Sequence, residues 1–271
     1  MPQPFALAAP PATLPIVCFA FGELYGMAEL YVSRLYEMLG RHCHQPFTLY
    51  CYTDRPRRLP AQTVQRDCAG WRELERAGMR PTTRKLGLFN PCYVEFDRFL
   101  YLDLSLIVRG DMTALIADAF SRPEDLVIVR HWVNEGYNSS VMCIHRGGLT
   151  AIYDAFVDGE CYEQRVPGDQ DFIRAVVLRH GLQGRVAHFP DGQIVSFKKT
   201  VRTGRRSASA ARQLFQQATI VKFHGSPKMH EAFASRYRLR LRWGELLHGN
   251  LRPVVPLGEL HRAWLGSGLA R

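Results

Sequence analysis

A carboxylate and a serine hydroxyl interrupt an apolar stretch of this sequence. Residues 99–108, FLYLDLSLIV, carry Asp103 and Ser105 in an otherwise aromatic and aliphatic run. Such a run predicts a buried central strand, where positions two apart face the same way. Because a buried carboxylate needs a partner, two interpretations stay open. Asp103 could cap a turn past the strand, or it could hold a metal ion or phosphate at the strand's carboxyl end.

Four further patches place polar residues where predicted strands or helices begin or end. Taken singly, each has an ordinary structural interpretation: Asp169 could cap a helix, and His224 could be a hydrogen-bonded core histidine. Asn138 could form a turn, and Tyr25 could be a packing residue. The patches are FGELY (21–25), YNSS (137–140), GDQDF (168–172) and KFHGSPK (222–228).

The elements that must position these residues alternate between strand and helix patterns. This order predicts an α/β fold with a mixed, mostly parallel central sheet flanked by helices. Residues 55–80 have no clear pattern and are expected to be irregular. The expected strands are 14–21, 46–54, 99–108, 125–132, 140–146, 185–190 and 219–225, and the expected helices are 28–42, 84–91, 111–120, 149–159 and 169–181.

Composition limits the class of protein. The chain has 271 residues, 46% of them hydrophobic, which is enough for a full core, and it has no apolar run of about 18 residues that could span a membrane. Seven cysteines without a CxxC pair predict reduced thiols in a cytoplasmic protein. The formal charge of +10 gathers at 55–58, 198–206 and 236–243, which suits a phosphorylated ligand, nucleic acid or an anionic membrane. No nucleic-acid-binding motif supports the second of these.

Together, the patches resemble the glycogenin-like retaining glycosyltransferases of the GT-A fold. The similarity is greater to a bacterial branch with a WGxxY start, a KLxLF segment and a late FHGxPKP loop. It runs from about residue 15 to residue 235. The matching segments here are FGELY, RKLGLF, YLDLSLIVRGDMTAL, YNSSVMCI, GDQDF, IVSFKK and KFHGSPKMHE.

The resemblance implies a divalent metal site, Mn²⁺ or Mg²⁺, made by Asp103, Ser105 and His224. Asp103 takes the place of the first acid of the family's aspartate-any-aspartate motif, and Ser105 stands where the second acid would be. A neutral hydroxyl is a poorer ligand than a carboxylate for a hard cation. Three outcomes are open: a weaker metal site, a metal-free site that uses Lys228 and nearby arginines, or nucleotide-sugar binding without turnover.

The resemblance also implies which residues meet the donor. The sugar and the reacting centre would face Asn138, Asp169 and Gln170, with Gln170 nearest the reacting carbon. The nucleotide and its diphosphate would contact Phe21, Tyr25, Lys85, Asp103, Leu104, Ser105, Gly225 and Lys228.

The expected function is transfer of a sugar, from a UDP-sugar, to a hydroxyl of a saccharide or lipid-linked acceptor with retention of configuration. The alternatives are a catalytically impaired nucleotide-sugar-binding protein and a basic nucleic-acid-binding protein. We expect a flexible arm at 1–13 and a single domain at 14–271, with a nucleotide-binding half (14–130) and an acceptor and closing half (131–271). The basic, aromatic segment 236–243 predicts a peripheral contact with the inner face of an anionic membrane.

Overall fold

The structure is a computed structural model of the whole chain, and it describes residues 11–23, 26–163, 167–201, 208–234 and 257–266. The chain divides into two compact units that are described separately. The first unit comprises residues 1–29, 45–103 and 113–189, and the second comprises residues 30–44, 104–112 and 190–271. Neither the expected arm at 1–13 nor the expected single domain is tested by this division, and both stay predictions.

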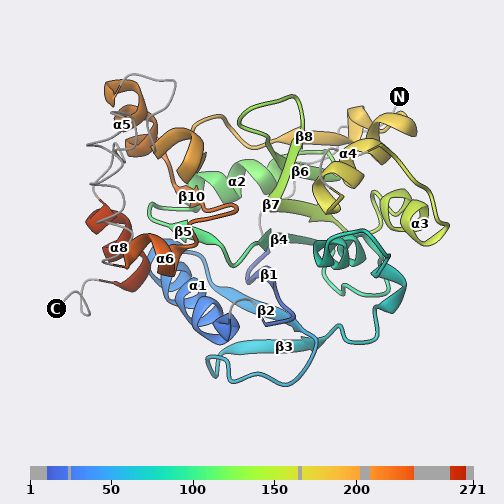
Figure 1. Cartoon of the computed structure of the whole chain (residues 1–271), viewed down its shortest axis with the longest axis horizontal. Coiled ribbons are helices and arrows are strands. Elements are labelled where there is room, and N and C mark those ends of the chain that lie inside the picture. The colour runs from blue at the N-terminus through green and yellow to red at the C-terminus, as the bar shows by residue number, and fades with distance from the viewer. Residues whose placement is uncertain (1–10, 24–25, 164–166, 202–207, 235–256, 267–271) are drawn as a thin grey trace. The chain divides into compact units, whose positions relative to one another are not determined.

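Strands and helices alternate along the chain as the sequence predicts (Figure 1). The strands are β1 (Leu14–Ala20), β2 (Phe47–Thr53), β3 (Thr63–Asp67), β4 (Arg98–Leu102), β5 (Leu106–Val108), β6 (Leu126–Arg130), β7 (Tyr137–His145), β8 (Val186–His188), β9 (Ile194–Ser196) and β10 (Ile220–Lys222). The α-helices are α1 (Ala28–His42), α2 (Thr113–Ser121), α3 (Ala151–Val157), α4 (Asp169–Arg179), α5 (Ala208–Gln217), α6 (Met229–Phe233) and α8 (Leu257–Leu265). Shorter helical turns are η2 (Arg72–Leu74), η3 (Pro81–Phe89), η4 (Gln183–Arg185) and η5 (Phe197–Val201).

The first unit contains a seven-stranded sheet in the order β3-β2-β1-β4-β7-β6-β8. β3, β2, β1 and β4 run parallel to one another, and β6 runs parallel to β8, whereas β7 runs antiparallel to both β4 and β6. The predicted fold class, a mixed and mostly parallel α/β sheet flanked by helices, is therefore confirmed. Parallel neighbours bring the carboxyl ends of β1, β2 and β4 to one edge of the sheet, where polar residues follow them.

Apolar side chains cover both faces of the central strands of this sheet. Phe19 of β1, Tyr101 of β4 and Met142 of β7 belong to one continuous apolar cluster with Phe172 of α4. Burying side chains of this size contributes about 2 kcal/mol each, so this face contributes strongly to stability. The intervening positions, such as Leu100, are also fully buried, so the central strands have no solvated face. That accounts for their continuous apolar sequences.

The run 99–108 is not one strand, which corrects the sequence-based prediction. β4 ends at Leu102, Asp103 has no regular structure, and Leu104 and Ser105 form a turn before β5. β5 belongs to a separate three-stranded sheet of the second unit, in the order β5-β10-β9. The run therefore spans the end of one sheet and the start of the other. Because both sheets bury their apolar side chains, the only breaks in its apolar pattern are Asp103 and Ser105.

Other boundaries also differ from the prediction. The patch 137–140 is not a turn, because β7 begins at Tyr137 and its pairing with β6 shifts register between Ile128 and Val129. Residues 55–80 are not wholly irregular, since Thr63–Asp67 pairs with β2 as an edge strand. The expected helix 84–91 is a 3₁₀ segment that begins earlier, at Pro81.

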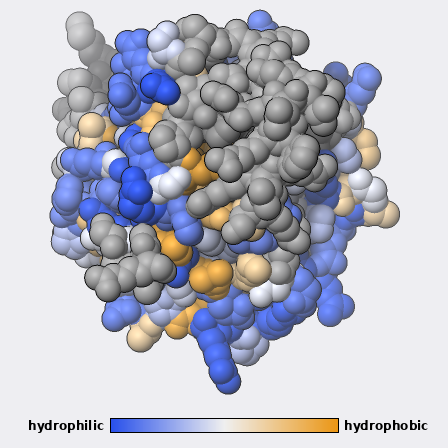
Figure 2. All heavy atoms as spheres, turned by 60° about the vertical axis from the view of Figure 1, so that its left-hand side comes forward, coloured by the Kyte–Doolittle hydropathy of each residue, from blue (hydrophilic) through white to orange (hydrophobic). Residues whose placement is uncertain are grey.

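The described surface is mostly polar on the face drawn in Figure 2, with hydrophobic side chains interspersed. In the ranges that the structure describes, none of the helices is long and apolar enough to cross a membrane. The basic segment 236–243, for which a peripheral membrane contact is predicted, lies outside the described residues.

Candidate active site

Asp103 directly follows β4, at the edge of the first unit's sheet. Its backbone N–H donates a 2.9 Å hydrogen bond to the Ser140 carbonyl of the neighbouring strand β7. Its carboxylate accepts a 2.6 Å hydrogen bond from the Tyr101 hydroxyl, two positions earlier in the chain. The backbone bond and the phenol fix the carboxylate at the carboxyl end of β4, where open α/β sheets bind ligands.

Lys85 of η3 lies between two carboxylates. Its ammonium is 2.8 Å from Asp103 Oδ1 and 3.3 Å from Asp169 Oδ2. The Lys85 and Asp169 side chains are almost fully buried, at 7% and 6% exposure, whereas that of Asp103 is 18% exposed. The structure therefore brings together three residues that the sequence placed in the site, from η3, the end of β4 and the start of α4. We call Lys85, Asp103 and Asp169 the charge cluster.

Electrostatics within the charge cluster favour its ionised form. Burial alone would lower the pKa of Lys85, but the negative charges of Asp103 and Asp169 outweigh this and raise it. Burial raises the pKa of the Tyr101 hydroxyl well above its ordinary value, and the charge of Asp103 raises it further. Both groups therefore keep their protons at neutral pH and stay hydrogen-bond donors to the carboxylates.

Asp169 begins α4, whose amino-terminal end favours a negative charge. Its carboxylate also accepts a hydrogen bond from the Ser139 hydroxyl of β7. The next residue, Gln170, accepts a 3.2 Å hydrogen bond through Oε1 from Asn138 Nδ2. The predicted sugar-facing residues Asn138, Asp169 and Gln170 therefore lie side by side on β7 and α4, adjacent to Lys85.

Local packing positions Lys85. Pro81 starts η3, and the Thr83 hydroxyl donates a 2.7 Å hydrogen bond to the Leu74 carbonyl. Gly87 is required for close packing, because an ideal Cβ there would lie 2.7 Å from the Trp71 ring, closer than real side chains approach. The glycine allows the η3 backbone to lie against Trp71, which sets where Lys85 emerges.

The loop after β1 is held by two residues that the sequence analysis did not single out. Gly22 has a φ of +62°, and its N–H donates a 2.9 Å hydrogen bond to Asp54 Oδ2. Arg57 donates to the Gly22 carbonyl at 2.6 Å and to Asp54 Oδ1 at 2.8 Å. Phe21, a predicted nucleotide contact, is half-buried against Phe19, whereas Tyr25 lies outside the described residues. The charged turn after β2 was the available signal for Asp54 and Arg57.

The remaining predicted residues lie in the second unit. Leu104 is buried, and the Ser105 hydroxyl accepts a 2.6 Å hydrogen bond from the ammonium of Lys222, the last residue of β10. The Lys222 side chain was missed by the sequence analysis, although it opens the KFHGSPK patch. His224 Nδ1 lies 3.4 Å from the Ser196 hydroxyl of β9.

Gly225 and Lys228 follow His224 in the second unit, and Lys198 lies beside Gly225. Gly225 has a φ of +65°, and a Cβ there would lie 2.9 Å from the Lys198 ammonium, so glycine suits both the backbone and the space. Lys228 precedes α6, and its N–H donates a 2.7 Å hydrogen bond to Glu231 Oε2. Gly225 and Lys228 therefore share one short loop with His224, as their spacing predicts.

The predicted metal ligands are divided between the two units, with Asp103 in the first and Ser105 and His224 in the second. Their convergence on one ion stays a prediction. In the described part of the chain, no three histidine, cysteine, aspartate or glutamate side chains lie close enough together to hold a metal ion.

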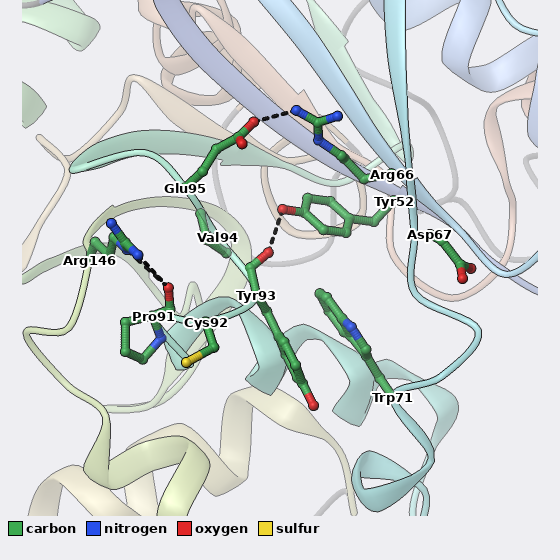
Figure 3. Close-up of a pocket in the computed structure, with 10 residues that line it drawn as sticks. All are labelled: Tyr52, Arg66, Asp67, Trp71, Pro91, Cys92, Tyr93, Val94, Glu95 and Arg146. Atoms are coloured by element: carbon green, nitrogen blue, oxygen red, sulfur yellow. Dashed lines mark hydrogen bonds and ion pairs between the residues drawn. The ribbon is translucent and has the colours of Figure 1, made fainter.

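A separate hollow of about 330 Å³ opens in the first unit beside Trp71 and Tyr93, whose rings stack 4.5 Å apart (Figure 3). Its charged side chains already have partners: Arg66 pairs with Glu95, and Arg146 donates a 2.8 Å hydrogen bond to the Pro91 carbonyl. None of the predicted site residues lines this hollow, so the hollow is distinct from the charge cluster.

Comparison with known proteins identifies the fold of this chain. No protein-family model matches the sequence, and no curated protein matches it by sequence. Solved structures do match. The galactosyltransferase LgtC, determined with donor and acceptor sugar analogues, has 15% identity, a TM-score of 0.54, and coverage of 90% of this chain and 98% of its own. The chain has the GT-A glycosyltransferase fold.

Two further structures agree with this assignment. The glycosyltransferase GlyE of Streptococcus pneumoniae is 17% identical with a TM-score of 0.52, over 93% of this chain and 63% of its own. Mouse xyloside xylosyltransferase 1 is 15% identical with a TM-score of 0.52, over 80% of this chain and 98% of its own. At these identities the GT-A likeness is one of fold, and the chain's activity has to be inferred from its residues.

Proposed function

We propose that this chain is a glycosyltransferase that moves a sugar from a nucleotide donor, a UDP-sugar, to a hydroxyl of a saccharide or lipid-linked acceptor. The observation that carries the proposal is the charge cluster, in which Lys85 lies between Asp103 and Asp169 at the carboxyl end of the sheet. The GT-A fold supports it, since LgtC was determined with donor and acceptor sugar analogues.

The charge cluster suits the donor side of such a reaction. As the glycosidic bond breaks, negative charge grows on the leaving diphosphate and positive charge grows on the sugar ring. A carboxylate and an amide oxygen beside the ring stabilise the oxocarbenium-like sugar, and we assign these roles to Asp169 and Gln170. The hydrogen bond from Asn138 to Gln170 orients that amide. Lys85 fixes the two carboxylates, so they need no reorganisation during the reaction.

We propose retention of configuration for the transfer. In a retaining reaction the acceptor oxygen attacks the face from which the diphosphate leaves, and an oxygen of the departing diphosphate takes the acceptor's proton. No side-chain base is then needed beside the acceptor. The anomer of the product, measured by NMR with an α-linked UDP-sugar, tests this part: a β-linked product would contradict it.

A binding protein without turnover is the second candidate, and Ser105 is the observation that favours it, since the neutral residue stands where the family's motif has an acid. A thermal-shift panel of nucleoside diphosphates and nucleotide sugars, followed by an assay for UDP release, separates the two. Binding with UDP release supports the transferase, whereas binding without release in any metal condition supports the binding protein. If no nucleotide or nucleotide sugar shifts the melting temperature, both are wrong.

A further inference from the structure

Ser105 stands where the family that the sequence resembles has its second motif acid. In this chain a lysine side chain contacts Ser105. The Lys222 ammonium donates a 2.6 Å hydrogen bond to Ser105 Oγ, and Lys222 is only 5% exposed. The backbone holds this arrangement. β5 and β10 pair antiparallel with Lys222 opposite Leu106, and the Phe223 N–H donates a 2.9 Å bond to the Ser105 carbonyl. Strand pairing therefore places the ammonium at Ser105.

These residues do not fit a divalent cation at Ser105. A hydroxyl is a weak ligand for Mg²⁺ or Mn²⁺, and the positive charge of an ammonium 2.6 Å from its oxygen opposes a second positive charge there. The other motif residue, Asp103, also has a lysine ammonium, that of Lys85, at 2.8 Å. Each of the two side chains that would ligate the metal thus has a cationic neighbour already.

We propose that the Lys222 ammonium takes the place of the metal ion and supplies the positive charge that binds the donor's diphosphate. This inference rests on the proposed function, and it makes donor binding independent of divalent metal. A lysine carries one fixed charge and three hydrogen-bond donors, which suit phosphate oxygens.

Neighbouring groups of the second unit support an anion site at this end of the three-stranded sheet. Lys222 pairs in register with Ser196 of β9, whose hydroxyl lies 3.4 Å from the His224 imidazole. The Lys198 ammonium lies beside Gly225, 2.9 Å from where a Cβ at that position would be. The stacked rings of Phe197 and Phe223, 4.2 Å apart, hold these two segments together. Lys198 thus lies beside the loop that carries His224 and Gly225, and Lys222 ends the strand that leads into this loop.

The test is isothermal titration calorimetry of the full chain with UDP, in EDTA and in Mn²⁺. We expect wild type to bind UDP with the same affinity in both conditions. Binding only with Mn²⁺ would overturn the role of Lys222 and leave the proposed transferase standing. Binding in neither condition would overturn both. Because this comparison uses unmodified protein, it stays decisive even if a variant fails to fold.

Variants then test whether Lys222 supplies the positive charge that binds the diphosphate. Lys222→Met should weaken UDP binding in EDTA by about tenfold or more, the cost of one lost charge-assisted contact. Lys199→Met is the matched control, since it removes the same charge from an exposed neighbour of Lys198 and should leave the affinity unchanged. A folded Lys222→Met protein that binds UDP as wild type does would show that this lysine only stabilises the sheet.

Discussion

The Tyr101 hydroxyl donates a 2.6 Å hydrogen bond to the carboxylate of Asp103, two positions further along the chain. This contact answers why an apolar run carries an acid. Asp103 lies just beyond β4, and its Oδ1 contacts both the buried Tyr101 phenol and the Lys85 ammonium. Asp103 is therefore part of a polar cluster at the carboxyl end of β4.

Asp103→Asn should abolish sugar transfer and preserve the fold. The amide oxygen can still accept the bond from Tyr101, but the negative charge beside Lys85 is lost. We expect turnover to fall by about a hundredfold or more, the scale seen when one preorganised electrostatic group is removed. UDP release measures turnover, and circular dichroism checks the fold. Asp191→Asn, at an exposed position, is the control. Full activity in Asp103→Asn would exclude Asp103 from the site.

Lys85→Met should destabilise the protein at neutral pH. It leaves the carboxylates of Asp103 and Asp169 close together and partly buried without their shared cation, a change that costs about 3–5 kcal/mol. Urea unfolding at pH 7.5 measures the loss. A deficit well below this range would contradict this account.

The raised pKa of Lys85 sets the pH range over which its contribution to stability is present. The pKa of Lys85 is raised in the folded state, so its stabilisation is fully present below the ordinary lysine pKa of about 10.4. It is lost only as the pH rises through the higher folded value. The contribution of Lys85 itself should thus be constant between about pH 6 and 9, and the difference in urea midpoint between Lys85→Met and wild type should not change across this range.

Gly87→Ala should destabilise the first unit by about 1–3 kcal/mol, the usual cost of overpacking. The added methyl would lie 2.7 Å from the Trp71 ring. Gly184→Ala is a suitable control, since a Cβ there meets nothing within 4 Å. Thermal melts of both variants make the comparison. Equal melting temperatures would mean that η3 moves away from Trp71 at no cost, in which case its glycine is not needed for packing.

Ser105→Asp alone should not create Mn²⁺-dependent UDP binding. The sequence alone suggests the reverse, but the new carboxylate would lie within reach of the Lys222 ammonium and pair with it. Only the double variant Ser105→Asp with Lys222→Ala should gain affinity for UDP when Mn²⁺ is added, as measured by calorimetry. Mn²⁺ dependence in the single variant would show that Lys222 leaves the carboxylate free for metal.

The sequence predicted the larger elements well, because their apolar periodicity is strong. The strand at 14–21, the helix at 28–42 and the helix at 169–181 all occur, with ends within one or two residues. Short segments were less predictable. Residues 99–108 look like one strand because two different sheets each bury their part of the run. β9 has only three residues, too few to show an alternation.

The site was predictable only in part, for a similar reason. Asp103, Asp169 and Lys85 were found through motif spacing, and the structure brings them together. Lys222 was missed because a lysine at the end of a short apolar strand normally reaches solvent, and strand pairing between β5 and β10 decides where it points. Asp54 and Arg57 were missed because charged residues beside prolines are typical of ordinary surface turns.

The contact between Gly87 and Trp71 also bears on how this chain can change during evolution. A larger residue at position 87 is tolerable only if position 71 becomes smaller, since an ideal Cβ at 87 already overlaps the indole. Among related sequences these two positions should therefore covary, with a side chain at the first accompanied by a reduced ring at the second. In sequences with this exchange, η3 would have a different position. Lys85, which η3 carries, would then reach the two carboxylates from a different point.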